Sequence, residues 1–258
     1  MCEQMMNISS IPAALRAQLA ALQPPSGHGV WPFGAPAVDA CLPGGGLPLG
    51  VLHEVSAMGI DVEAGASGAG FLACLVGAIA RGREVFWIGP AVADLHPPGL
   101  LTYGLDPGRL VMVETRDDDA SLAAMEAVLR AGGAGAVVGE VGRLGRVAAR
   151  RLQLACLKHG TTGFVLRRWP HGRKPMAEEP IAAVTRWEIA PAPTAIIAGT
   201  PGPARWRVRL VHARGGFEGG WIMQAREGDH DGPHPLRMVA GLAAAAAAPD
   251  AGRTRSAS

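Results

Sequence analysis

The chain has 258 residues, of which 48% are hydrophobic and 18% are charged. Its apolar content is too high for a disordered chain, and its 36 glycines and 21 prolines are too many for a coiled coil or an all-helical bundle. The formal net charge of +2 does not indicate a general nucleic-acid binder.

Cysteine and lysine usage narrows the class of protein further. The four cysteines are far apart and form neither a zinc motif nor a disulfide framework, so we expect a reduced, cytoplasmic protein without a metal site. The N-terminus lacks the pattern of a secretory signal, and the longest apolar stretch, 71–80, is far shorter than the roughly 20 residues that span a bilayer. Lys158 and Lys174 are the only lysines, which excludes a lysine-bearing phosphate loop in the N-terminal half.

The predicted elements begin with a helix that Ser10 caps and that PPSGHG ends, so residues 1–30 are expected to form an N-terminal helix and linker. Between 31 and 216, short apolar strands alternate with amphipathic helices. This alternation predicts an α/β core with a mostly parallel sheet flanked by helices. The predicted strands are 51–55, 84–88, 110–114, 136–139 and 163–167, and the predicted helices are 68–81, 144–159 and one over 118–131 that Asp118 or Asp119 caps.

The pattern changes after Pro180, where three predicted strands follow one another without helices. They cover 184–189, 206–212 and 221–226, and RGGFEGG between the last two predicts a hairpin turn. The sheet is therefore expected to end in antiparallel strands. Residues 217–258 are expected to hold the last hairpin strand, an alanine-rich helix and a disordered tail.

The order of these motifs resembles the core of the RecA recombinase. The segment FGAPAVDACLPGGGLPLGVLHEV, residues 33–55, is similar to the entry into that core. The likeness continues in the same order through 94–114, 118–131, 136–144 and 150–168. The resemblance implies a RecA-like fold.

More closely, the whole chain is similar to the ImuA family, through its short N-terminal helix, PFG followed by LPGGGLPLGVLHE, GEV and RRLQLA. The resemblance implies an SOS-induced accessory protein of error-prone translesion DNA synthesis that acts as a non-catalytic adaptor. The implied partners are an ImuB-like homologue of Y-family polymerases, a second, error-prone polymerase α subunit and RecA. Single-stranded DNA is a further expected ligand, and a membrane is not.

Two other functions stay open from the residues. One is a RecA-type ATPase with an altered nucleotide site, which hydrolysis abolished by Glu140→Gln would favour. The other is a cell-division inhibitor similar to SulA, which filamentation on overexpression without a polymerase partner would favour.

The stretch that corresponds to the phosphate loop departs from G-x-x-x-x-G-K-[ST] at three positions. With Gly68 as the last motif glycine, Ala69 replaces the lysine, Gly70 replaces the hydroxyl residue, and Glu63 replaces the first glycine. We therefore expect no ATP cofactor and no hydrolysis. Gly65, Gly68 and Gly70 either retain an anion-binding turn at a helix N-terminus or form a turn that only preserves the fold.

The resemblance also locates two positions where RecA-like ATPases carry acidic residues. Val92 stands where the water-activating glutamate is expected, and Glu140 stands at the place of the Walker B carboxylate. Glu140 is interpreted as either a metal-binding or a structural group. The valine is a further reason to expect no catalysis.

Basic residues are concentrated in one segment. Residues 141–177 carry nine Lys and Arg and no acidic side chain, so the remainder of the chain has a formal charge of −7. In a RecA-like core this segment includes two loops, 141–146 and 167–175, that face single-stranded DNA. Direct DNA contact, docking of an acidic protein and a solvated face are the three alternatives. The candidate contact residues are Arg143, Arg146, Arg167, Arg168, Trp169, Arg173 and Lys174.

Overall fold

A nine-stranded sheet forms the centre of the computed structural model, which describes residues 28–59, 61–90, 92–169, 182–194, 196–197, 199–226 and 234–242. The strand order is β13-β12-β11-β8-β3-β7-β6-β4-β5. The strands of this sheet are β3 (Leu52–Ala57), β4 (Val85–Gly89), β5 (Leu110–Glu114), β6 (Ala136–Val141), β7 (Thr162–Arg167), β8 (Thr185–Pro191), β11 (Arg205–Ala213), β12 (Gly219–Ala225) and β13 (Leu236–Gly241).

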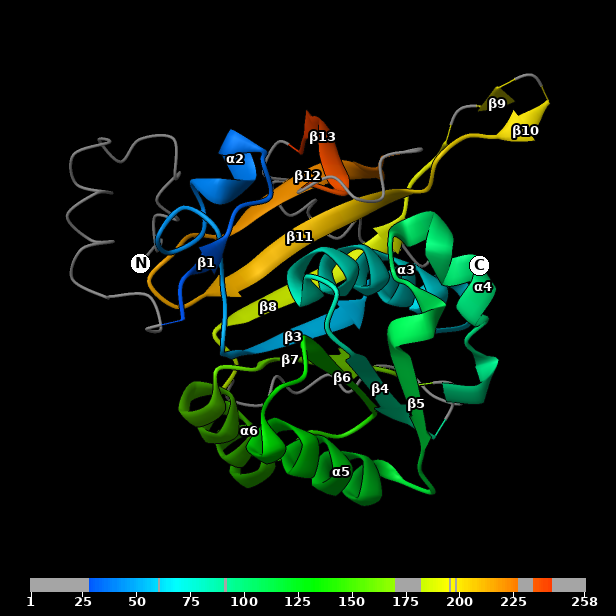
Figure 1. Ribbon diagram of the computed structural model, residues 1–258. Helices are drawn as coiled ribbons and strands as arrows, with labels where there is room; N and C mark the ends of the chain where they lie inside the picture. The colour runs from blue at the N-terminus through cyan, green and yellow to red at the C-terminus, as the bar shows by residue number, and fades with distance from the viewer. Residues whose placement is uncertain are drawn as a thin grey trace, which may run out of the picture.

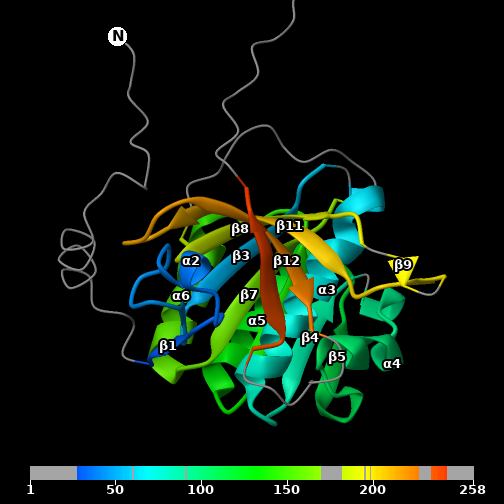
Figure 2. The same cartoon turned by 90° about the horizontal axis from the view of Figure 1, so that it is seen from above.

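The sheet is parallel from β8 to β5 and antiparallel from β8 to β13, which confirms the predicted fold class. Every residue of β3, β6 and β7 is buried, as expected for central parallel strands covered on both faces. Figures 1 and 2 show the antiparallel strands side by side, away from the β5 edge.

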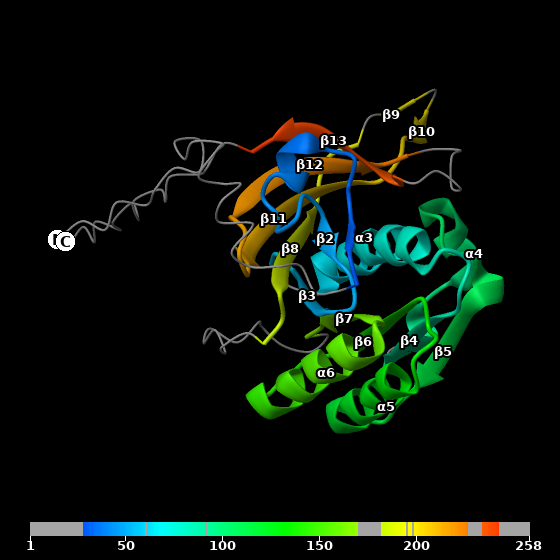
Figure 3. The same ribbon diagram turned by 60° about the vertical axis from the view of Figure 1, so that its left-hand side comes forward.

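Three long helices cover the two faces of the sheet. Helix α3 (Asp61–Ala80) packs on one face, and helices α5 (Asp118–Ala131) and α6 (Arg146–His159) pack on the other (Figure 3). Two separate hydrophobic clusters result, one around α3 and one beneath α5 and α6. Alternate residues of β6 divide between them: Val138 belongs to the first cluster and Val137 to the second.

Short elements complete the described fold. These are β1 (Val30–Trp31), β2 (Leu47–Pro48), β9 (Ile196–Ile197), β10 (Thr200–Pro201), α2 (Pro36–Asp39), α4 (Pro97–Leu100), and the 3₁₀ turns η2 (Val92–Asp94), η3 (Leu101–Tyr103) and η4 (Pro107–Arg109). Within the described residues, no helix is both long and apolar enough to cross a membrane.

Most predicted elements are confirmed within a few residues, but three predictions need correction. Helix α3 begins at Asp61 rather than at Gly68, so the expected glycine-rich turn is helical. The cap of α5 is Asp117, whose Oδ1 accepts from the Ala120 amide at 2.8 Å, because Asp118 is turned toward another loop. Strand β13 was missed.

The expected boundary between 216 and 217 falls in the turn between two strands of one sheet. Strand β11 pairs with β12, and β12 pairs with β13, so residues up to Gly241 extend the sheet. The predicted hairpin turn itself is confirmed. The predicted N-terminal helix, the alanine-rich helix and the tail lie outside the described residues.

Candidate functional site

The region that corresponds to a phosphate loop is part of helix α3. Strand β3 ends at Ala57 and the helix begins at Asp61. Gly65, Gly68 and Gly70 therefore lie inside the helix, where backbone amides bond to carbonyls of the preceding turn. These three glycines are therefore in helical conformation rather than in the expected turn, and their amides face carbonyls of the preceding helical turn.

The glycines of α3 allow close packing instead. A Cβ at Gly68 would lie 3.0 Å from Leu166 Cδ1, and one at Gly70 would lie 3.4 Å from Trp206 Cζ2. Ala69, at the position of the missing lysine, is 7% exposed and belongs to the hydrophobic core. The helix is therefore seated against the sheet at the point where a phosphate loop would leave room for a nucleotide. The side chain of Glu63 lies outside the described residues.

Glu140 lies near the end of β6 and is 1% exposed. Its Oε1 accepts a hydrogen bond from Trp87 Nε1 at 2.8 Å, and its Oε2 lies 3.5 Å from the Arg168 guanidinium. A Cβ at Gly89, on the neighbouring β4, would lie 2.7 Å from Glu140 Cβ, so the site needs glycine there. The carboxylate is thus held by protein groups, and the structural interpretation fits this geometry.

Val92 is 2% exposed and lies in the core cluster around α3. Its isopropyl group has no proton to exchange. The position that the resemblance assigned to a water-activating glutamate is therefore filled by a packing residue.

A second buried carboxylate, Glu54 on β3, binds two arginines. Its Oε1 accepts from Arg167 Nη1 at 3.0 Å, and its Oε2 accepts from Arg186 Nη2 at 3.2 Å. Arg167 also donates to the Gly142 carbonyl at 2.9 Å, and its guanidinium lies 5.3 Å from the Trp169 ring centroid. We call Glu54, Glu140, Arg167, Arg168 and Arg186 the inner charge network.

Sequence reasoning missed Glu54 and its partners. The usable signal was a carboxylate in the predicted central strand 51–55, since a buried charge needs a counter-charge. Pairing across 113 positions of sequence is set by β3 lying beside β7, which the strand pattern alone does not reveal.

The basic candidates therefore divide into two groups. Arg167 is buried, and Arg168 is largely buried, with 21% of its side chain exposed, so both charges are directed into the fold. Arg143 and Arg146 are exposed at the start of α6, where Asp118 accepts from the amides of Gly142 and Arg143 at 3.0 and 2.8 Å. Arg173 and Lys174 lie outside the described residues.

Three buried ionisable groups outside the inner charge network, His53, Cys74 and Cys156, are held neutral. Burial lowers the pKa of His53 to about 4, and its ring nitrogens lie 2.7 Å from Thr185 Oγ1 and 2.9 Å from the Pro48 carbonyl. Burial also raises the pKa of the Cys74 and Cys156 thiols to about 12. Such thiols are poor nucleophiles at neutral pH because the thiolate is the reactive form.

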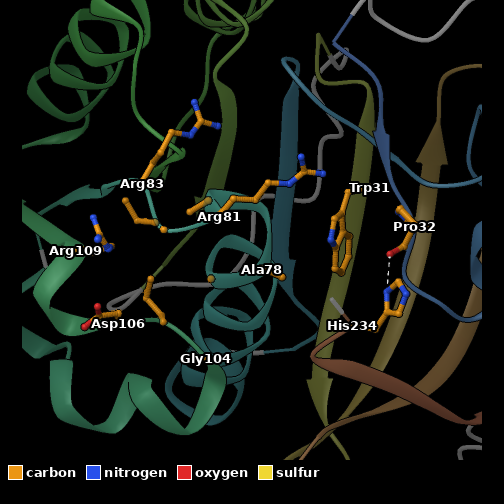
Figure 4. A pocket seen from close by; sticks show the side chains of 14 residues that line it. Trp31, Pro32, Ala78, Arg81, Arg83, Gly104, Asp106, Arg109 and His234 are labelled. Atoms are coloured by element: carbon orange, nitrogen blue, oxygen red, sulfur yellow. Dashed lines mark hydrogen bonds between the residues drawn. The ribbon is translucent and has the colours of Figure 1, made fainter. Parts of the chain in front are cut away.

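A hollow of about 750 Å³ lies at the amino ends of the parallel strands, where β4 and β5 begin (Figure 4). Glu140 lies at the other, carboxyl end of these strands. Arg81, Arg83 and Arg109 line one side, and Trp31 and His234 line the other. Arg109 lies 3.8 Å from Glu84, and His234 is 3.1 Å from the Pro32 carbonyl. Across the described residues, no group of three His, Cys, Asp or Glu side chains is placed to hold a metal ion.

Comparison with known proteins gives a close relative. The chain is 45% identical over 223 residues to "Protein ImuA" of Caulobacter vibrioides, covering 82% of this chain and 89% of the relative, and the same figures hold for two strains. No family model matches the chain.

Two solved structures are similar in shape. A KaiC-like protein from Pyrococcus horikoshii matches 81% of this chain and 98% of its own length, with a TM-score of 0.50 and 17% identity. At that identity the match supports the fold alone, which is RecA-like. SulA from Pseudomonas aeruginosa matches 46% of this chain and 98% of its own length, with 24% identity and a TM-score of 0.39.

Proposed function

The chain belongs to the ImuA family, and we propose that it acts in error-prone translesion DNA synthesis as a non-catalytic adaptor. In this proposal the RecA-like core presents binding surfaces to an ImuB-like partner related to Y-family polymerases, and it uses no ATP. RecA, an error-prone polymerase α subunit and single-stranded DNA are the further ligands to be tested.

The start of helix α3 is the observation that carries this proposal. A phosphate loop needs free amides and a lysine at the end of the first core strand. Here the chain is helical from Asp61, and Ala69 is packed in the core. The same residues that would bind phosphate instead fix α3 to the sheet.

The inner charge network supports the same conclusion. Glu140, the one acidic residue at a position expected for metal binding, is held by Trp87 and Arg168. A Mg²⁺ ion would have to displace the Arg168 guanidinium from this carboxylate, and Mg²⁺ usually keeps several of its bound waters, for which a carboxylate with 1% exposure leaves little space.

The first test asks whether the full chain binds nucleotide. Thermal unfolding is measured with and without ATP or ADP and Mg²⁺, beside an active RecA protein as the positive control. We expect no stabilisation and no phosphate release. Saturable nucleotide binding with hydrolysis above a buffer control would overturn the non-catalytic part of the proposal.

The second test asks whether the chain is an adaptor. The purified full chain is mixed separately with the ImuB-like protein of the same genome, RecA, the polymerase α subunit and a labelled oligo-dT strand. We expect a stable complex with the ImuB-like protein on size exclusion, and deletion of the gene should lower damage-induced mutation frequency. A chain that binds none of these ligands is not an adaptor.

A further inference from the structure

The outer side of helix α6 carries an apolar stripe that no described element covers. The inner side of the helix is buried against the sheet through Leu152 and Cys156. On the outer side Val147 is 75% exposed, Leu154 is 48% exposed and Leu157 is 39% exposed. Val147 and Leu154 are seven residues apart, so they lie on the same face two turns apart.

Basic side chains flank this stripe. Arg146, Arg150 and Lys158 are exposed, and the helix contains no acidic residue. Arg151 is left out of this group because it forms an ion pair with Glu126 of α5, although 62% of its side chain is exposed. We call Arg146, Val147, Arg150, Leu154, Leu157 and Lys158 the α6 face.

The composition of the α6 face favours a protein over a nucleic acid. Single strands are bound by basic grooves with aromatic rings for base stacking, and α6 has no aromatic side chain. An apolar stripe in the middle of the face offers nothing to a phosphate backbone. A helix with apolar residues at the same spacing and acidic residues beside them would pack against the apolar stripe and form ion pairs with the basic side chains beside it.

We propose that the α6 face docks an acidic amphipathic helix of the ImuB-like partner. This inference rests on the proposed function, since it names the surface through which the adaptor holds that partner. The stripe extends over the eleven residues from Val147 to Leu157, a rise of about 15 Å, which matches about three turns of a docked helix. The basic flanks attract the acidic segment, and burial of the Val147 and Leu154 side chains contributes most of the binding free energy.

The test measures the affinity of the full chain for the purified ImuB-like protein. The double variant Val147→Glu/Leu154→Glu removes the stripe and adds repelling charge, and we expect binding about 30-fold weaker. The variant Arg150→Glu/Lys158→Glu should weaken binding most at low salt, because screening reduces the charge term. Leu101→Glu and Arg237→Glu are matched controls, since Leu101 is 50% exposed on η3, which packs against α3, and Arg237 is exposed on the edge strand β13.

Each contrary result separates one alternative from the proposal. Failure of the wild-type chain to bind the ImuB-like protein would overturn the proposed function and the inference with it. Equal binding by the wild type and the α6 variants would overturn the inference and leave the adaptor proposal standing. Loss of oligo-dT binding, or of self-association on light scattering, with unchanged affinity for the ImuB-like protein would assign the face to DNA or to a second copy instead.

Discussion

The inner charge network and the α6 face both concentrate arginine, and they use it in opposite ways. Arg167 and Arg186 share the buried Glu54, whereas Arg150 and Lys158 are exposed beside apolar side chains. Both regions lie in or beside the segment that the sequence marks as basic. Charge density along the chain therefore does not identify a binding surface until burial separates charges that hold the fold from charges that are free to meet a ligand.

The largest effect should come from breaking the inner network. Glu54→Ala leaves the buried Arg167 and the largely buried Arg186 without their carboxylate, and we expect a loss of about 3–5 kcal/mol in the free energy of unfolding. Urea unfolding monitored by circular dichroism measures it. Glu84→Ala, which removes the acid of an exposed pair with Arg109, is the control and should change the free energy by less than about 1 kcal/mol. Equal losses for the two variants would remove the distinction between inner and outer charges.

The second prediction tests whether restoring the missing lysine is enough to restore ATP binding. Ala69→Lys restores the residue type of the phosphate loop, but at a buried position of α3. We expect a loss of about 2–4 kcal/mol from burying an ammonium group, with no gain in ATP binding.

Ala66→Lys is the matched control, because Ala66 is exposed on the same helix. It should change the free energy of unfolding by less than about 0.5 kcal/mol. A stable Ala69→Lys variant that binds ATP would mean that the region around α3 can reopen into a loop.

The sequence predicts the order of strands and helices well because central strands are apolar throughout and the helices are amphipathic. The predicted start of α3 is wrong, because the intrinsic preference of GASGAG is for a turn rather than a helix. Packing overrides that preference, since a Cβ at Gly68 would lie only 3.0 Å from Leu166 Cδ1 and Gly70 lies in ordinary contact with Trp206. Strand β13 was missed because prolines precede it and an alanine run follows, which together are typical of a loop and a helix.

The functional residues divide in the same way. Ala69 and Val92 could be assigned from the resemblance alone, because they are substitutions within a known pattern. The partners of Glu54 and Glu140 could not, since each pair joins strands that meet only in the folded sheet. The apolar stripe of α6 could not be separated from the buried stripe on the opposite side of the same helix until the packed side was known.

The third prediction concerns pH and the strand that carries Glu54. Burial lowers the pKa of His53 from 6.5 to about 4, so the unfolded chain binds more protons than the folded chain between these values. The stabilisation is present above pH 6.5 and is lost as the pH falls toward 4. We expect the wild type to lose about 2 kcal/mol more than His53→Asn between pH 7 and pH 5. Parallel pH profiles for the two proteins would mean that folding does not lower the pKa of His53.

The smallest effect should be found on the α6 face. Arg150→Ala, Leu154→Ala and Lys158→Ala remove side chains that contact solvent, so each should change the free energy of unfolding by less than about 0.5 kcal/mol. The measurement is urea unfolding of the chain alone, without any partner. A loss above about 1 kcal/mol for Leu154→Ala would mean that another segment of the same chain covers the stripe. Near-zero changes, set against the large loss for Glu54→Ala, would instead mean that the exposed basic and apolar groups of α6 contribute nothing to folding and are available to a partner.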